Sequence, residues 1–239
     1  MRPTGILFDK DGTLFDFEAT YAPACARVVR ALAGGDEERA ARMAAAVDFD
    51  LAAERFRPHS VVIAGCAADL ARAWRALMPT APGAAFERRI DDLFELHTRD
   101  TARLFAGAMA ALGRLAGGGM RIGLATNDAE ANARAHLRAA GLDDLIGFVA
   151  GYDSGHGAKP EPGMIHAFAR HCGCSSERVV MVGDSLRDMA AARAAGAVAV
   201  AVTTGPATAA ELAPFADAVI GGLDELAALP LIGLTEATA

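Results

Sequence analysis

The strongest constraint on the fold is a short apolar run near the start of the chain, Gly5-Ile6-Leu7-Phe8, which ends abruptly in Asp9-Lys10-Asp11-Gly12-Thr13. An apolar run of this length, bounded by charges and a glycine, predicts a buried strand. In an open parallel sheet, ligands bind outside the carboxyl ends of the strands, so Asp9 and Asp11 occupy a position where reactive groups are expected. Two carboxylates this close repel each other, and either a shared proton or a divalent cation relieves the repulsion.

The Asp-x-Asp-Gly pattern also occurs in calcium loops and in simple turns, so it does not decide the chemistry alone. An EF-hand continues with oxygen ligands at alternate positions and a glutamate at its twelfth position. Here the next residues, Thr13-Leu14-Phe15, are mostly apolar, which disfavours calcium buffering. With a divalent cation bound, Asp9 could attack an electrophile while Asp11 gives and takes a proton.

Beyond about residue 107 the sequence alternates between helical and strand patterns. Short apolar runs follow stretches with apolar residues at helical spacing, and they predict strands at residues 122–125, 148–149, 179–182, 198–202 and 218–220. Strands that are separated by helices pair in parallel through right-handed crossovers. The expected fold class is therefore α/β, with a Rossmann-like parallel sheet.

The segment between the first strand and this alternating part has helical patterns throughout. We expect helices at residues 18–32, 37–56, 67–78 and 85–103, with a break at Arg57-Pro58-His59-Ser60. An all-helical block inside an alternating chain predicts an inserted domain. The expected organisation is a core of residues 1–16 and 100–239 with a helical insert of residues 17–99.

Composition and charge restrict the class of protein. The 239 residues, 53% of them hydrophobic, suffice for one large domain or for a core with a modest second module. A formal net charge of −7 without a dense Lys/Arg run argues against nucleic acid as a partner. There is no secretory leader pattern and no run of about 20 apolar residues. We expect a cytoplasmic protein without membrane contact, monomeric or homodimeric, whose four cysteines are reduced thiols: Cys25, Cys66, Cys172 and Cys174.

Three further strand ends carry polar groups. Thr126-Asn127-Asp128 could hold phosphate oxygens at a helix N-terminus or simply cap that helix. Lys159-Pro160 follows a glycine-rich loop, and its lysine could serve a site or lie solvated on the surface. Gly183-Asp184-Ser185-Leu186-Arg187-Asp188 ends the most apolar strand, and Asp184 and Asp188 could share one face of the following helix.

The order of the four clusters along the chain, Asp-x-Asp-Gly-Thr, Thr-Asn, Lys-Pro and Gly-Asp-Ser-x-x-Asp, resembles the haloacid dehalogenase superfamily of phosphotransferases. The resemblance covers the whole core and the position of the helical insert, which is similar to that family's cap. It implies a sheet with the strand order 5-4-1-2-3, which brings the motif-bearing strand ends together. It also implies Mg²⁺ as the cofactor and a small phosphorylated metabolite as the substrate.

The resemblance implies catalytic roles for individual residues. Asp9 would be the nucleophile that forms an aspartyl-phosphate, and Asp11 would act as the general acid and then as the general base. Thr126 and the backbone of Asn127 would hold the phosphoryl group, and Lys159 would neutralise the charge of the nucleophile and the phosphate. A migrating phosphoryl group, which carries charge on its equatorial oxygens, requires such a lysine and such oriented N–H groups.

The resemblance also implies a metal site. Mg²⁺ would be held by Asp9, by the main-chain carbonyl of Asp11 and by Asp184, with Asp188 acting through a water molecule or behind the ligands. Lys10 departs from the apolar residue that is common between the two aspartates. It either adds a cation near the site or points to solvent.

Asp11 distinguishes between activities of the superfamily. It argues against a dehalogenase, whose leaving halide needs no proton, and against a phosphonatase, which has a small residue at this position. The preferred function is a Mg²⁺-dependent phosphatase that hydrolyses a small phosphomonoester; a phosphosugar mutase is the alternative, and a non-catalytic relative is a third hypothesis. Arg55, Arg57 and His59 lie in a break within the insert, which could be a loop that faces the site or a solvated basic turn. In the first case the arginine pair could clamp a carboxylate such as that of phosphoglycolate.

Overall fold

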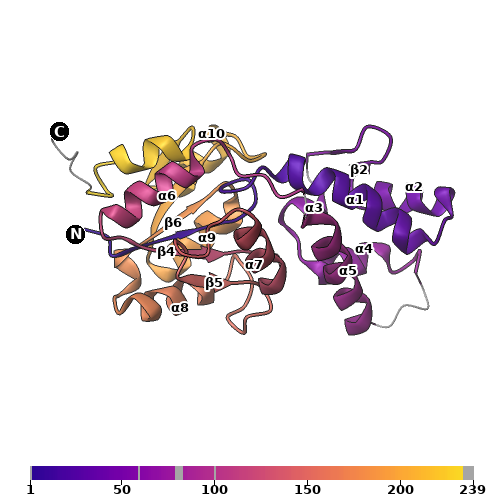
Figure 1. Ribbon diagram of the computed structural model, residues 1–239, viewed down its shortest axis with the longest axis horizontal. Coiled ribbons are helices and arrows are strands. Elements are labelled where there is room, and N and C mark those ends of the chain that lie inside the picture. The colour runs from indigo at the N-terminus through magenta and orange to yellow at the C-terminus, as the bar shows by residue number, and fades with distance from the viewer. Residues whose placement is uncertain (1, 59, 79–82, 100, 234–239) are drawn as a thin grey trace.

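A six-stranded parallel sheet forms the centre of the computed structural model, which describes residues 2–58, 60–78, 83–99 and 101–233 (Figure 1). The strands are β1 (Gly5–Phe8), β4 (Arg121–Ala125), β5 (Phe148–Ala150), β6 (Val179–Gly183), β7 (Val198–Val202) and β8 (Ala218–Ile220). Their order is β5-β4-β1-β6-β7-β8. When the first five of these strands are numbered along the chain and the sheet is read from β7 to β5, the order is 5-4-1-2-3, as predicted. Strand β8 extends the sheet beyond β7. The predicted α/β class is confirmed.

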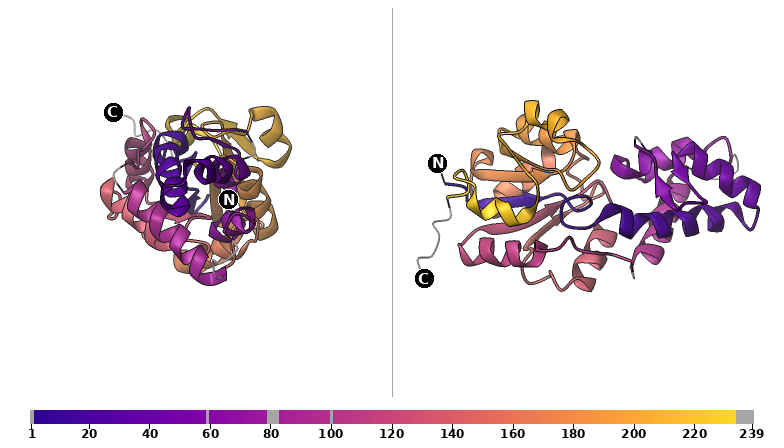
Figure 2. Two further views of the ribbon diagram at one scale, coloured as in Figure 1. Left: turned by 90° about the vertical axis from the view of Figure 1, so that its right-hand side faces the viewer. Right: turned by 90° about the horizontal axis from the view of Figure 1, so that it is seen from above.

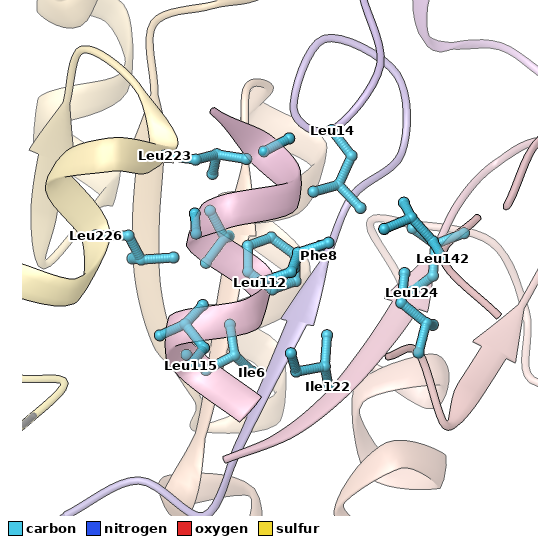
Figure 3. Close-up of a cluster of buried hydrophobic side chains, with 14 of the residues drawn as sticks. Ile6, Phe8, Leu14, Leu112, Leu115, Ile122, Leu124, Leu142, Leu223 and Leu226 are labelled. Carbon is cyan, nitrogen blue, oxygen red and sulfur yellow. The ribbon is translucent and has the colours of Figure 1, made fainter. Parts of the chain in front are cut away.

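Helices cover both faces of the sheet, as a parallel sheet requires. Ile6 and Phe8 of β1 pack on one face against Leu112 of α6, as Figure 3 shows, whereas Leu7 packs on the other face among residues of α8 and α9. This alternation buries β1 on both sides and fixes where Asp9 emerges. The helices around the sheet are α6 (Ala108–Gly117), α7 (Glu130–Ala139), α8 (Gly163–Cys172), α9 (Leu186–Ala195) and α10 (Ala209–Leu212), with short 3-10 turns η1 (Ser176–Arg178), η2 (Ala213–Phe215) and η3 (Leu223–Ala228).

A helical unit lies beside the sheet, at the right of Figure 1 and of the right-hand view in Figure 2. It contains α1 (Phe17–Ala33), α2 (Glu37–Ala46), α3 (Val61–Ala64), α4 (Ala67–Trp74), α5 (Gly83–Thr98) and a hairpin of β2 (Phe49–Asp50) and β3 (Arg55–Phe56). Its side chains form a hydrophobic cluster separate from those of the sheet. Trp74 is fully buried in this cluster, and its indole N–H donates to the carbonyl of Met43 at 2.9 Å.

The helix predicted at residues 37–56 is wrong beyond Ala46, where the β2–β3 hairpin replaces it. Asp48, between α2 and β2, and Glu54, in the turn between β2 and β3, adopt positive φ angles of 52° and 48°. The Asp50 carboxylate also accepts hydrogen bonds from the backbone N–H groups of Ala52 and Ala53, a local arrangement that competes with helix formation. The helices predicted to reach residues 78 and 103 are shorter than expected and end at Trp74 and Thr98.

The chain leaves the sheet and returns to it at adjacent positions. The backbone N–H of Asp16 donates to the carbonyl of Arg103 at 2.7 Å, and the N–H of Phe105 donates to the carbonyl of Leu14 at 2.9 Å. Residue 100, where the predicted core resumes, lies outside the described residues. All four cysteines are free thiols. Within the described ranges, no helix is long and apolar enough to cross a membrane.

Candidate active site

A cavity of about 840 Å³ lies where the carboxyl ends of the strands face the helical unit. The sheet side contributes polar residues that follow β1, β4 and β6, together with one lysine from the loop after β5. The helical unit contributes mainly apolar side chains. From the sheet side the lining includes Asp9, Asp11, Thr126, Asn127, Lys159 and Asp184, and from the helical side Phe17, Tyr21, Leu70, Ile90 and Phe94.

The side chains that follow four different strands meet at this cavity. The ammonium of Lys159 donates to Asp9 Oδ1 at 2.5 Å and to Asp188 Oδ1 at 2.6 Å. One carboxylate oxygen each of Asp9, Asp184 and Asp188 lie within 4.8 Å of one another. Asp184 precedes α9, and Asp188 lies in its first turn, where its carboxylate accepts from Ser185 as part of a capping box. The two acids therefore converge on one point, although Asp184 is outside the helix on which they were predicted to share a face.

The three carboxylates share a single lysine, which leaves the cluster short of positive charge. Burial raises the pKa of Asp9 to about 7, although the Lys159 ammonium opposes this effect and the nearby Asp188 carboxylate adds to it. Burial also raises the pKa of Asp184 well above its usual value, reinforced by the charges of Asp9 and Asp188. A further cation at this point would favour the ionised form of each acid.

The residues present fit a small divalent cation. Such ions take oxygen ligands, and Mg²⁺ is typically bound through one or two carboxylates together with water. Asp184 also lies in a close cradle of two glycines. A Cβ atom at Gly12 would lie 2.7 Å from Asp184 Cγ, and one at Gly205 would lie 2.5 Å from the same atom, both too close for ordinary contact. Only glycine at these two positions leaves room for the Asp184 carboxylate to point toward Asp9 and Asp188.

Thr126 and Asn127 line the cavity directly after β4. The hydroxyl of Thr126 accepts from the backbone N–H of Asp128 at 3.0 Å, which shapes the turn before α7. The side-chain amide of Asn127 brackets the backbone of Lys159: its Oδ1 accepts from the Lys159 N–H at 2.8 Å, and its Nδ2 donates to the Lys159 carbonyl at 3.0 Å. Asn127 thus fixes the position of the lysine, a contact that the sequence did not suggest.

Asp11 lies at the cavity wall, but its side chain is not part of the three-carboxylate cluster. Its Oδ2 pairs with Lys10 at 2.9 Å, whereas its Oδ1 is buried without a hydrogen-bond partner among the described residues. Burial raises the pKa of Asp11, although the charge of Lys10 opposes this rise. A carboxyl group with a raised pKa retains its proton more readily, as a general acid must.

The two arginines that were predicted to clamp a carboxylate, Arg55 and Arg57, are not among the residues that line the cavity. Arg55 is exposed and pairs with Glu18 at 3.9 Å, and exposed Arg57 uses its backbone N–H to bond the carbonyl of Asp48. His59, predicted with them, lies outside the described residues. Pro58 and Ser60 of the same segment do line the cavity. In this arrangement the two arginine side chains do not form the predicted carboxylate clamp.

Sequence reasoning missed a buried polar network beside the site. Lys10 is fully buried and contacts Asp128, Tyr21 and His136 besides Asp11. Of the two roles predicted for Lys10, burial excludes the side chain that points to solvent, and the contact with Asp11 agrees with a cation near the site. Neither prediction included the other three partners. The sequence signal that could have indicated this network was Lys10 itself, because it directly follows a buried strand at a position where the resembling family commonly has an apolar residue.

Comparisons with known proteins agree with this geometry. A family model described as haloacid dehalogenase-like hydrolase matches residues 3–196. Phosphoglycolate phosphatase of Rhodospirillum rubrum is 41% identical over 104 residues, 44% of this chain and 43% of that protein, so the match spans less than half of this relative. N-acetylmuramic acid 6-phosphate phosphatase of Pseudomonas putida is 29% identical over 208 residues, 86% of this chain and 85% of that protein. The crystal structure of CbbY from Rhodobacter sphaeroides in complex with phosphate shares the fold, with a TM-score of 0.73, 23% identity and coverage of 97% of this chain and 100% of that one.

Proposed function

The chain belongs to the haloacid dehalogenase-like hydrolases, and on this premise we propose that it is a Mg²⁺-dependent phosphoric monoester hydrolase with Asp9 as the nucleophile. The observation that carries the proposal is the convergence of Asp9, Lys159 and Asp184 at one cavity, with the buried Asp188 carboxylate next to them. A phosphoryl group in transfer carries negative charge on its equatorial oxygens, so catalysis consists mainly of positioning and charge stabilisation. The cluster offers a nucleophile, a lysine and a set of cation ligands in one place.

In the first half-reaction a carboxylate oxygen of Asp9 attacks phosphorus, and the bond between phosphorus and the ester oxygen breaks. Asp11 donates its proton to that departing oxygen, which leaves as an alcohol. Lys159, fixed by the Asn127 side chain, stabilises the negative charge around Asp9. The product of this step is an aspartyl-phosphate on Asp9.

In the second half-reaction the oxygen of a water molecule attacks the phosphorus of the aspartyl-phosphate, and Asp11, now ionised, takes a proton from this water. The bond between phosphorus and the Asp9 oxygen breaks, which releases inorganic phosphate and restores the carboxylate. Asp9, Asp184 and Asp188, with the main-chain carbonyl of Asp11, would hold Mg²⁺. Bound there, the ion supplies positive charge that offsets the repulsion between Asp9 and the incoming phosphate.

The proposed substrate class is a small phosphomonoester. Phosphoglycolate is the first compound to test, because that substrate appears in the name of the Rhodospirillum rubrum relative. We propose that the helical unit is the cap, with the predicted bounds 17–99. It would select the substrate because it supplies the apolar wall of the cavity. Binding between two units also allows the cavity to exclude water from the reacting groups.

The test compares wild type with Asp9→Asn on p-nitrophenyl phosphate and 2-phosphoglycolate in the presence of Mg²⁺. Asp9→Asn should reduce phosphate release to background, because the amide is not a nucleophile for phosphorus. Asp143→Asn makes the same substitution at an exposed position away from the cavity lining and should keep wild-type activity. Normal turnover by Asp9→Asn would refute the nucleophile assignment. Release of many phosphates per enzyme molecule separates hydrolysis from an intramolecular mutase reaction.

A further inference from the structure

The two lysines of this chain are both buried beside the cavity. Among 23 basic residues only Lys10 and Lys159 are lysines, and the other 21 are arginines. Lys159 is 5% exposed and Lys10 is 0% exposed. Arginine and lysine differ in shape: the guanidinium is a planar fork, whereas the ammonium is a compact charge with three donors. The chain therefore uses the compact cation at these two buried positions and arginine everywhere else.

Burying the Lys10 ammonium costs desolvation free energy, so its presence at this position needs an explanation. Removing a charge from water costs several kcal/mol unless ion pairs and hydrogen bonds compensate it. Lys10 Nζ lies 2.9 Å from Asp11 Oδ2, 2.8 Å from Asp128 Oδ2, 2.9 Å from the Tyr21 hydroxyl and 3.0 Å from His136 Nδ1. An apolar side chain could occupy the same buried place without desolvating a charge, so packing alone does not explain the lysine.

The contact with Asp11 makes the two oxygens of that carboxyl group different. Oδ2 accepts from the Lys10 ammonium, which makes it the poorer place for a proton. Oδ1 is buried and has no partner among the described residues. A proton carried by Asp11 therefore belongs on Oδ1, and the Lys10 contact keeps the group from rotating to exchange the two oxygens.

Lys10 is itself held from the opposite side by residues of both units. The Tyr21 hydroxyl, on α1 of the helical unit, donates to Asp128 Oδ2 at 2.6 Å, and Asn132 Nδ2 of α7 donates to the same oxygen at 2.6 Å. His136 Nε2 lies 2.7 Å from the hydroxyl of Thr98, the last residue of α5. The ammonium is thus located by partners on α1 and α7 and by Asp128 before α7, and Thr98 of α5 supports His136, which gives Asp11 a fixed point of attachment.

We infer that Lys10 is a positioning residue for proton transfer: it holds Asp11 Oδ2, so that Oδ1 delivers the proton to the departing ester oxygen and later takes one from water. This inference rests on the proposed function, in which Asp11 is the general acid and base. Lys10 touches neither phosphorus nor the ester oxygen in this scheme. Its effect should therefore depend on how much the leaving group needs a proton.

The test measures kcat/KM for two phosphomonoesters, with Mg²⁺ present. p-Nitrophenolate leaves readily without a proton, whereas the alkoxide of propyl phosphate requires one. Because kcat/KM reports the steps through the departure of the leaving group, Lys10→Met should lower it about 10²-fold for propyl phosphate and only about 3-fold for p-nitrophenyl phosphate, in line with the contribution of general acids. Asp11→Asn serves as the reference, with the same selective loss at equal or larger size.

A second variant keeps the test decisive if Lys10→Met does not fold. Asp128→Asn preserves the volume and the lysine but weakens its anchor, and it should lower kcat/KM for propyl phosphate about 5-fold more than for p-nitrophenyl phosphate. Thermal unfolding checks the fold of each variant. Equal losses on both substrates, or no loss in a folded variant, would overturn the inference. If wild type hydrolyses neither compound nor any other phosphomonoester, the proposed function fails instead.

Discussion

Gly205→Ala tests whether the geometry around Asp184 controls the proposed Mg²⁺ site. A Cβ at this position would lie 2.5 Å from Asp184 Cγ and 2.7 Å from Asp184 Cβ, whereas ordinary van der Waals contact begins at 3.4 Å. The carboxyl group must therefore retreat by at least about 0.9 Å, and by more at Oδ2, which is the atom nearest to the new Cβ, while no charge is added or removed. The backbone of Gly205 is not in the left-handed region, so alanine causes no strain of its own there. Any effect on activity should come from the displaced carboxylate.

A displacement of this size is large for Mg²⁺, which demands near-ideal octahedral geometry at about 2.0–2.1 Å. Misplacing a catalytic group by about 1 Å can cost about 10²-fold in rate, or about 2.7 kcal/mol. We therefore expect Gly205→Ala to lower kcat about 10²-fold at saturating Mg²⁺ and to raise the Mg²⁺ concentration needed for half activity at least 10-fold. The measurement is phosphate release from p-nitrophenyl phosphate across a Mg²⁺ titration.

Gly113→Ala is the matched control. Gly113 lies in α6, its φ is ordinary, and a Cβ there would meet no atom within 4 Å. The substitution should leave the Mg²⁺ titration unchanged and stabilise the helix by about 0.5–1 kcal/mol, because alanine loses less conformational freedom than glycine. If folded Gly205→Ala kept the kcat and the Mg²⁺ dependence of wild type within a factor of two, the cradle would not control the position of Asp184.

Two further predictions concern the cation and the buried histidine. Removing divalent ions with a chelator should abolish activity and lower Tm, because an ion that binds only the folded state stabilises it by about 2.7 kcal/mol at 100 times its Kd. Adding Mg²⁺ should restore both activity and Tm in wild type but not in Asp184→Asn. A Tm and a turnover that do not depend on metal would contradict the proposed ligand set. Burial and the charge of Lys10 lower the pKa of His136 from 6.5 to about 3, so between these values the unfolded chain binds more protons. The contribution of neutral His136 to the free energy of unfolding is complete above pH 6.5 and falls by up to about 1.4 kcal/mol per pH unit below it. The measurement is the free energy of unfolding of wild type and of His136→Asn from pH 7 to pH 4.5. Parallel curves for the two proteins would contradict the prediction.

The sheet and the convergence of polar strand ends were predictable from the sequence because both depend on local patterns. Apolar runs such as Val179–Val182 mark strands wherever they occur, and in a parallel sheet the residue after each strand emerges at the same edge. The meeting of Asp9 with Asp184, which directly follow β1 and β6, is explained by that rule. Lys159 lies further along the loop after β5, and only the family resemblance assigned it to the site.

The β2–β3 hairpin and the Lys10 network were not predictable in the same way. The hairpin depends on positive φ angles at Asp48 and Glu54, and alanine-rich flanking sequence conceals such turns. The partners of Lys10 come from α1 and from the region of α7, and a contact such as the one with His136 spans 126 residues without any local pattern. The contact with His136 becomes visible only when the packing of α7 against the end of β1 is known, and the contact with Tyr21 only when the packing of the helical unit on the sheet unit is known.

The 2.7 Å hydrogen bond between Asp16 and Arg103 makes the two ends of the intervening segment immediate neighbours, as close as the two ends of a hairpin turn. A stretch of chain whose ends already meet can grow, shrink or be exchanged without moving the strands on which they are anchored. Relatives could therefore acquire new selectivity by grafting a different module at this joint while inheriting the reaction chemistry intact. Selectivity and chemistry can therefore change separately, provided that the exchanged module keeps the contacts that Tyr21 and Thr98 make with the sheet unit.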